Sequence, residues 1–349
     1  MNNSPKFIKR VLLNFFIFIF FIIIFIIFVD PIANINLWPS QVFIAQNNNM
    51  VFNKAKLMEK DKSFEAIVLG SSTSETFLTS DINSIFKTKS FHASVPGSNT
   101  LIRYVLFKKA LETFHELKYV FYILDFYELN HLRDDRRIYN NEMLRELTEG
   151  ISYKVRQSTW QDALTTYFSF QSFMESLQVV RKYFTKKHPI LLSDGTLNWP
   201  NVIREEHPIE KVQGSVDSEQ FNSAIEYFYQ LHIKDYLNNF DHLNPEVVDI
   251  FQKMNQLAKE RKIKIFYILS PIHNLLKEKF FSHTKLKERF KEWQNEMTSY
   301  ADEKNVFVFN FFEHKFLNEN YSNVTHDGLH YNANINRFFL EQVKLKLKE

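Results

Sequence analysis

A run of apolar residues near the N-terminus imposes the strongest constraint on how this chain folds. The segment from Val11 to Val29 spans about 19 residues, has Asn14 as its single polar residue, and ends at Asp30-Pro31. This length is sufficient for a helix to cross the hydrocarbon core of a bilayer. A core helix rarely carries bulky apolar side chains on every face, as this segment does. The segment is therefore predicted to be a single transmembrane helix.

The flanks of the segment predict an uncleaved anchor and its orientation. A cleaved signal peptide usually has an apolar core of about 7–15 residues followed by a site of small residues, and neither feature is present. Lys6, Lys9 and Arg10 precede the run, and basic residues favour the cytoplasmic side of a membrane. Residues 1–30 are therefore assigned to a membrane anchor and residues 31–60 to a linker, with everything after Asp30 outside the cytoplasm.

The rest of the chain alternates short apolar strands with amphipathic helices. Strands are predicted at 66–69, 90–95, 119–124, 263–269 and 306–309, and helices at 80–86, 99–114, 245–261, 286–303 and 333–347. This alternation is typical of a parallel sheet covered by helices on both faces. Residues 61–349 are assigned to one α/β domain with an insertion at about 130–243. The insertion is predicted to be helical over 134–187 and to continue as loops from 188, and it is interpreted as a lid.

Composition excludes several classes of function. The chain contains no cysteine, which excludes disulfides, thiolate metal sites and a cysteine nucleophile. Its net charge is +3 over 349 residues, so no nucleic-acid partner is expected. The histidines lack metal-ligand spacing, and neither a metal nor a cofactor is predicted. Glycine occurs only six times, where average usage would give about two dozen, so each glycine is expected where no other residue fits.

Three polar motifs follow predicted strands, at the sheet edge where open parallel sheets bind ligands. The first, GSSTSE (70–75), can present a serine hydroxyl to a substrate and the serine N–H to a developing oxyanion. The second, VPGSN (95–99), contains Gly97, whose backbone can approach closely enough to donate another N–H. The third, THDGLH (325–330), places an aspartate three residues before a histidine. A catalytic triad needs such a base and a carboxylate that orients it.

These motifs resemble those of the SGNH, or GDSL-like, hydrolase superfamily, whose blocks are Gly-Asp-Ser, a glycine loop and Asp-x-x-His. The Gly-Ser-Ser variant is similar to the envelope acyl-transfer proteins of the DltD and AlgJ/AlgX kind. The resemblance covers residues 64–130 and 245–347, and implies a flavodoxin-like three-layer sandwich with a five-stranded parallel sheet of order 2-1-3-4-5. It also implies Ser72 as the nucleophile, Asp327 as the orienting acid and His330 as the base. The N–H groups of Ser72 and Gly97 would be the oxyanion donors.

The third block of the superfamily, Gly-x-Asn-Asp, has no counterpart here, because LDFYE (124–128) follows the third strand. Its asparagine completes the oxyanion hole, and loss of one such donor costs about 2.7–4 kcal/mol where measured. Either another group such as Asn99 substitutes, or the enzyme is slow, or catalysis has been lost. Asp125 could bind substrate or hold a loop, with the structural role slightly favoured. His273 could contact substrate or be an ordinary surface histidine.

The resemblance implies serine-dependent acyl transfer, such as O-acetylation, outside a bacterial cytoplasmic membrane. The expected substrate is a glycan, polymer or lipid-linked precursor of the cell envelope, and the expected partner is a polytopic membrane O-acyltransferase. An esterase or deacetylase is an alternative, because it would use the same triad with water as the acceptor. A non-catalytic glycan-binding or scaffolding protein is a further alternative, which the missing asparagine favours.

Overall fold

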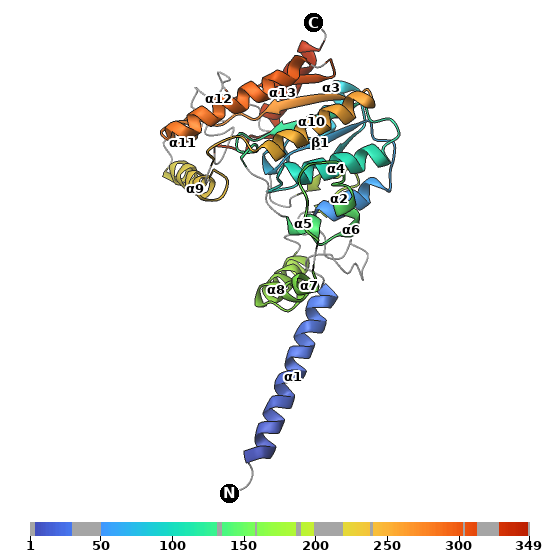
Figure 1. The fold of residues 1–349 in the computed structure, drawn as a ribbon, viewed down its shortest axis with the longest axis vertical. Helices are drawn as coiled ribbons and strands as arrows, with labels where there is room; N and C mark the ends of the chain where they lie inside the picture. The colour runs from blue at the N-terminus through green and yellow to red at the C-terminus, as the bar shows by residue number, and fades with distance from the viewer. Residues whose placement is uncertain are drawn as a thin grey trace.

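The structure is a computed structural model that describes residues 4–29, 50–130, 135–157, 159–185, 190–198, 219–237, 240–302, 304–312 and 328–347. The N-terminal helix α1 (Ser4–Val29) projects away from an α/β domain that holds most of the chain (Figure 1). In the described part of the chain, α1 is the one helix long and apolar enough to cross a membrane, over Lys6–Val29. Its length and composition suit either a membrane anchor or a signal sequence.

The centre of the domain is a five-stranded sheet in which every strand is parallel to its neighbours. Its strands run in the order β2-β1-β3-β6-β7, which confirms the predicted order 2-1-3-4-5. Strands β3, β6 and β7 end level, since Leu124 pairs with Leu269 and Leu269 with Asn310. Strand β1 ends two residues earlier, because its last residue, Leu69, pairs with Tyr122. The strands are β1 (Ala66–Leu69), β2 (Ser90–His92), β3 (Tyr119–Leu124), β6 (Lys264–Leu269) and β7 (Val306–Asn310).

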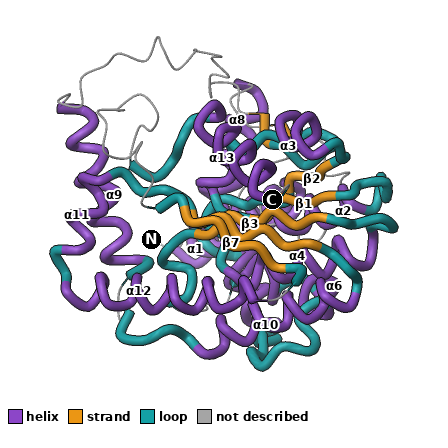
Figure 2. The backbone as a smooth tube through the Cα atoms, turned by 90° about the horizontal axis from the view of Figure 1, so that it is seen from above, coloured by secondary structure: helices purple, strands orange, loops and turns teal. Residues whose placement is uncertain are grey.

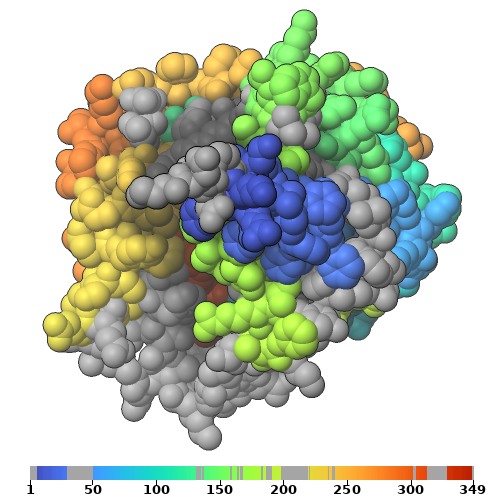
Figure 3. Space-filling view, turned by 90° about the horizontal axis from the view of Figure 1, so that it is seen from below, coloured from blue at the N-terminus to red at the C-terminus, as the bar shows by residue number. Residues whose placement is uncertain are grey.

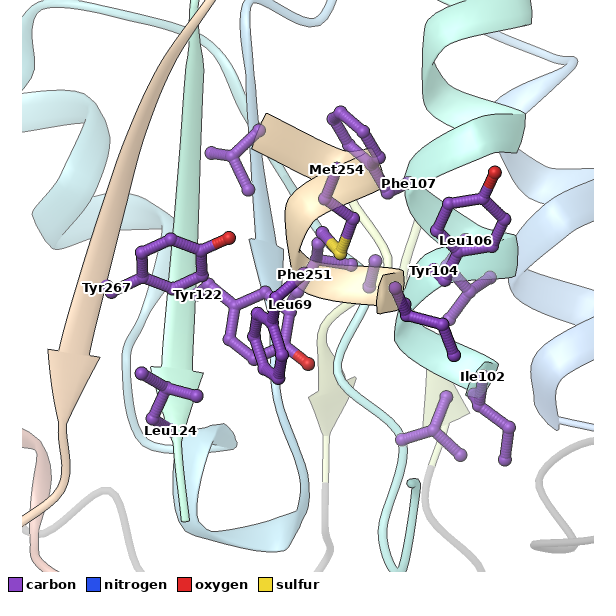
Figure 4. Packing of buried hydrophobic residues seen from close by; sticks show 14 of the residues in the cluster. Leu69, Ile102, Tyr104, Leu106, Phe107, Tyr122, Leu124, Phe251, Met254 and Tyr267 are labelled. Carbon is purple, nitrogen blue, oxygen red and sulfur yellow. The ribbon is translucent and has the colours of Figure 1, made fainter. Parts of the chain in front are cut away.

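Helices cover both faces of the sheet, as the alternation of elements predicts (Figure 2). One face packs against α4 (Thr100–Thr113) and α10 (Pro245–Glu260), and the other against α3 (Thr79–Phe86) and α13 (Ala333–Lys346). The α4–α10 side holds the larger apolar cluster, in which aromatic rings from β3, β6 and α10 pack together (Figure 4). The side chains of asparagines cap three of these helices, which fixes where each begins: Asn99 for α4, Asn244 for α10 and Asn332 for α13.

The domain begins earlier in the chain than residue 61. Helix α2 (Met50–Met58) lies within the segment assigned to a linker, yet Val51, Ala55 and Met58 are buried in the main core. It packs against α4. A nine-residue helix with two lysines carries too little apolar periodicity to stand out from a linker. Residues 30–49 lie outside the described residues.

In the described part of the insertion that follows β3, helices and a small β-hairpin precede a long helix, α9. Helices α5 (Arg136–Tyr139), α6 (Glu142–Glu146), α7 (Trp160–Tyr167) and α8 (Phe170–Thr185) precede a β-hairpin, β4 (Ile190–Leu191) and β5 (Leu197–Asn198). The hairpin corrects the prediction of a loop there: its turn residue Asp194 accepts a hydrogen bond from the N–H of His92, at the edge of the sheet. Helix α9 (Glu219–Asp235) packs against α11 (Asn274–Phe281), which α12 (Thr284–Ser299) follows.

Candidate active site

The predicted nucleophile lies on a tight turn directly after β1. Ser72 begins a 3₁₀ turn (Ser72–Ser74), and the Ser71 hydroxyl caps the turn by accepting from the N–H of Thr73. The turn folds back closely on the strand end: a Cβ at Gly70 would lie 2.4 Å from the Ser74 hydroxyl oxygen. Only glycine fits at such a distance, which accounts for Gly70 in a chain that contains few glycines.

The structure brings Ser72 and His330 together across 258 residues of sequence. The Nε2 atom of His330 lies 2.8 Å from the Oγ atom of Ser72, a hydrogen-bonding distance. Both side chains are partly exposed. This is the contact between nucleophile and base that a triad requires. Asp327, the predicted orienting acid, lies outside the described residues.

His330 follows a buried turn whose backbone is held by His273. Gly328 has φ +87°, a left-handed conformation that favours glycine, and its carbonyl accepts a hydrogen bond from the N–H of His273 at 2.9 Å. The His273 ring is buried against Phe221, and its Nδ1 accepts from the N–H of Leu275 at the start of α11. Burial lowers the pKa of His273. The interpretation as an ordinary surface histidine is therefore wrong, and contact of His273 with substrate stays a prediction.

Helix α9 of the insertion lies against the base. The ring of Phe228 packs edge-on to the His330 ring, with the ring centroids 5.9 Å apart. Phe228 also contacts His232 one turn further along α9. A segment of the insertion thus lies directly beside the predicted catalytic histidine, in the position that a lid would occupy.

Asp125 holds both neighbours of the nucleophile. Its Oδ2 accepts a hydrogen bond from the Ser71 hydroxyl at 2.7 Å, and its Oδ1 accepts from the Thr73 hydroxyl at 2.8 Å. The carboxylate is 4% exposed and also pairs with the guanidinium of Arg103 at 2.9 Å. These contacts occupy both oxygens, so the geometry favours the structural role over substrate binding. Asp125 thus fixes the Ser72 turn from the end of β3.

Arg103 connects the first and second motifs from inside the domain, and sequence reasoning missed it. Its guanidinium, 1% exposed, pairs with Asp125 and with Glu128, the latter at 2.5 Å. Its Nε also donates to the hydroxyl of Ser98, which in turn donates to the carbonyl of Gly70 at 2.9 Å. The sequence feature that could have identified Arg103 is its position as the single charged residue in the apolar run LIRYVLF of α4. A charge buried in this way requires charged partners.

The Arg103 cluster contains one cation and two carboxylates, all buried. Burial opposes the charge on Arg103, but Glu128 and Asp125 outweigh burial and raise its pKa. Burial also disfavours the charged form of Glu128 and raises its pKa to about 7, although Arg103 opposes this shift. The hydroxyl of Tyr122 donates to the same carboxylate at 2.6 Å.

The predicted oxyanion donors lie on two adjoining loops. Gly97 has φ +60°, and its carbonyl accepts from Arg137 of α5 at 2.8 Å, so the insertion also holds this loop. Within the described residues, neither the N–H of Ser72 nor that of Gly97 donates to another protein group. Asn99 uses its side-chain oxygen to accept from the N–H of Ile102 and cap α4. The proposal that Asn99 replaces the missing donor stays a prediction.

Comparison with known proteins gives no independent assignment. No model of a protein family matches the chain, and no curated protein matches its sequence. Among the described residues, no group of three or more His, Asp or Glu side chains is arranged to hold a metal ion.

Proposed function

We propose that this protein is a membrane-anchored serine acyl-transfer enzyme of the SGNH type, which acts on a glycan or polymer of the bacterial cell envelope. The observation that carries the proposal is the 2.8 Å contact between Ser72 and His330 at the carboxyl edge of a parallel sheet. Substrates of open α/β sheets bind at this edge. Helix α1 would anchor the domain outside the cytoplasmic membrane, beside a polytopic O-acyltransferase that supplies the acyl group.

The reaction divides into two acyl transfers. Ser72 Oγ attacks the carbonyl carbon of the acyl donor while His330 Nε2 takes the hydroxyl proton, and the N–H groups of Ser72 and Gly97 bind the oxyanion. His330 then gives the proton to the leaving group as the carbon–oxygen bond of the donor breaks. In the second step a sugar hydroxyl attacks the carbonyl carbon of the acyl-enzyme and gives its proton to His330. His330 then returns this proton to Ser72 Oγ as the bond between Ser72 and the acyl group breaks. Asp327 would hold the imidazole in the tautomer that both steps need.

The packing of Phe228 on His330 supports transfer over hydrolysis. An apolar ring beside the base limits access of water, which would otherwise compete with a sugar hydroxyl for the acyl-enzyme. An esterase or deacetylase with the same residues is the second candidate. A non-catalytic glycan-binding protein is the third. The observation that favours it is the absence of an asparagine from the position directly after β3, LDFYE (124–128), where Asp125 binds the Ser72 turn.

Labelling with a fluorophosphonate probe tests whether Ser72 is an activated nucleophile. We expect the full-length protein in detergent to be labelled, and Ser72→Ala to abolish labelling without loss of folding. Ser84→Ala is the matched control, because Ser84 is an exposed serine on α3 that bonds only locally, to the carbonyl of Asp81. Folded wild-type protein that is never labelled would favour the non-catalytic alternative.

The acyl content of the envelope polysaccharide distinguishes transfer from hydrolysis. A strain that carries Ser72→Ala is expected to lose acyl groups if the enzyme transfers them, and to accumulate them if it removes them. An unchanged acyl pattern would contradict both enzymatic proposals.

A further inference from the structure

The hairpin formed by α7 and α8, called here the α7–α8 hairpin, exposes an unusual amount of apolar surface. Trp160 is 70% exposed, Phe170 78% and Phe184 77%, and Phe168, Met174 and Leu177 are also exposed. Soluble surfaces rarely gather large apolar side chains in this way without a partner. Among the described residues outside α1, most of the exposed large apolar side chains belong to this hairpin.

The exposed apolar residues of α8 form one stripe along the helix. Phe170, Met174, Leu177 and Phe184 follow one another at spacings of four, three and seven, which places them on a single face. Ser172, Ser176 and Val179 are buried on another face, toward the rest of the protein. The exposed glutamines Gln171 and Gln178 lie about 100° around the helix from the stripe. The exposed Arg181 lies on the same face as the stripe, between Leu177 and Phe184. Helix α8 therefore has a protein face, a polar face and an exposed, mainly apolar face.

The hairpin lies against the domain-proximal end of α1. Phe25 of α1 packs edge-on to Phe173 of α8 with centroids 6.1 Å apart, and Ile26 and Val29 are buried in the same region. Figure 3, seen from the side of α1, shows α7 and α8 directly beside it. The apolar run of α1, Val11–Val29, has 19 residues, or about 28 Å at 1.5 Å per residue, which matches the roughly 30 Å hydrocarbon core. If α1 spans a bilayer, its last turn and the hairpin packed on it lie at the boundary between acyl chains and headgroups.

We propose that the α7–α8 hairpin lies in the membrane–water interface, with the apolar stripe of α8 and Trp160 inserted at the boundary between headgroups and acyl chains. The inference rests on the proposed function insofar as α1 spans the membrane. Two observations favour lipid as the occupant of this surface. The hairpin packs on the domain-proximal end of the apolar helix α1, and its exposed side chains include aromatic residues of the kind that concentrates at membrane interfaces.

This placement orients the site toward the bilayer. Helix α5, whose Arg137 binds the carbonyls of Pro96 and Gly97, lies at the end of the domain nearest to the hairpin (Figure 1). The carboxyl edge of the sheet thus faces the membrane, while α13 carries the chain to a C-terminus at the opposite end. A substrate held close to the lipid surface, such as a lipid-linked glycan, would reach Ser72 without leaving the membrane.

The absence of cysteine makes site-directed spin labelling a direct test. Single-cysteine variants Leu177→Cys, Gln178→Cys and Phe18→Cys of the full-length protein would carry a nitroxide in nanodiscs of phosphatidylethanolamine and phosphatidylglycerol. Collision with oxygen, which concentrates in lipid, is compared with collision with a water-soluble nickel chelate. We expect the ratio of oxygen to nickel collisions to be several-fold higher at Leu177 than at Gln178, and highest at Phe18.

The neighbours Leu177 and Gln178 are a matched pair, since both are exposed and share one helix turn. If the ratio of oxygen to nickel collisions were equally low at Leu177 and Gln178, as it is in water, the inference would be wrong. A high, lipid-like ratio at Phe18 in the same experiment would show that α1 nevertheless spans the membrane. A label at Leu177 shielded from both reagents would also overturn it, because it would place protein rather than lipid on the stripe. A water-like ratio at Phe18 would overturn the anchor and, with it, the inference.

Discussion

The two predicted catalytic side chains lie 2.8 Å apart, yet their surroundings hold them by different physical means. The Ser72 turn is fixed by directional bonds to Asp125, which a buried arginine supports from behind. The His330 turn is instead surrounded by apolar side chains: Phe228 packs on the imidazole, and Ile225 and Leu276 pack around Gly328.

This difference predicts which side can move. Hydrogen bonds to a buried carboxylate have narrow geometry and are costly to break, so the nucleophile is expected to keep one position throughout the reaction. Apolar packing is non-directional, so α9 can shift over His330 as substrates enter and leave. Substitutions on the Ser72 side should therefore lower stability more than substitutions on the His330 side, which should mainly alter the chemistry.

Arg103→Met should have the largest effect on stability. The substitution leaves Asp125 and Glu128 buried without their cation, and breaking a buried ion pair in this way costs about 3–5 kcal/mol. We expect the melting temperature of the full-length protein in detergent to fall by roughly 10 °C, measured by the intrinsic fluorescence of the tryptophans.

Arg337→Met is the control for this substitution. Arg337 also pairs with an aspartate, Asp81, at 2.9 Å, but its side chain is half exposed. Surface pairs contribute about 0–1 kcal/mol, so the melting temperature should change little. Equal losses in the two variants would show that the buried cluster has no special role.

The pH dependence of stability should report Glu128. Its pKa is about 7 in the folded protein and near 4.5 when unfolded, so between these values the folded state binds more protons than the unfolded state. The contribution of Glu128 to the free energy of unfolding is greatest below pH 4.5, decreases as the pH rises toward 7, and is constant above 7. The decrease is on the order of 3 kcal/mol.

Glu128→Gln tests the assignment, because the variant cannot titrate. Its unfolding free energy should vary less between pH 4.5 and 7 than that of the wild type, measured by denaturant titration at several pH values. Identical pH profiles for the two proteins would mean that Glu128 stays charged beside Arg103, and the raised pKa would be wrong.

Asp125→Asn should have a smaller effect on stability and a clear effect on activity. The amide can accept fewer hydrogen bonds than the carboxylate, so one of Ser71, Thr73 and Arg103 loses its acceptor, at a cost of about 2 kcal/mol. A displaced Ser72 turn should slow fluorophosphonate labelling by as much as roughly 10²-fold. Asp241→Asn, at an exposed carboxylate paired with Lys285, should label at the wild-type rate. Wild-type labelling of Asp125→Asn would show that the Ser72 turn needs no support from β3.

The sheet was predictable because its strands are short, continuous apolar runs between helices. Strands β1 and β3 begin and end at the predicted residues. Buried parallel strands are continuous apolar runs, so the first and last apolar residues mark their ends. Glycine scarcity was equally informative: Gly70 meets a close contact, and Gly97 and Gly328 have positive φ. The position of the motifs on this sheet, together with their resemblance to the SGNH motifs, predicted that Ser72 and His330 meet, and their side chains lie 2.8 Å apart.

The supports of the site were not predictable, because they depend on contacts between distant segments. Arg103 lies on α4, and its partners Asp125 and Glu128 lie beyond β3, so no local pattern joins them. The packing of Phe228 on His330 spans about a hundred residues and depends on where the insertion folds back. Sequence periodicity identifies helices, whereas it does not determine which face of an inserted helix lies over a site.

Phe228→Ala should have the smallest effect on stability and the most specific effect on chemistry. Phe228 is partly exposed, so its truncation should cost only about 1 kcal/mol, and labelling of Ser72 should persist. Opening the apolar cover of His330 should admit water and raise the share of acyl-enzyme that is hydrolysed rather than transferred. This share can be measured with a soluble ester donor and a sugar acceptor.

Tyr227→Ala provides the contrast for Phe228→Ala, because Tyr227 is the preceding residue on α9 and is 63% exposed. It should leave the partition between hydrolysis and transfer unchanged, since the tyrosine makes no described contact with the His330 ring. If Phe228→Ala also left the partition unchanged, α9 would not control access of water. The apolar residues around His330 would then only hold this side chain in place, as Asp125 holds the Ser72 turn.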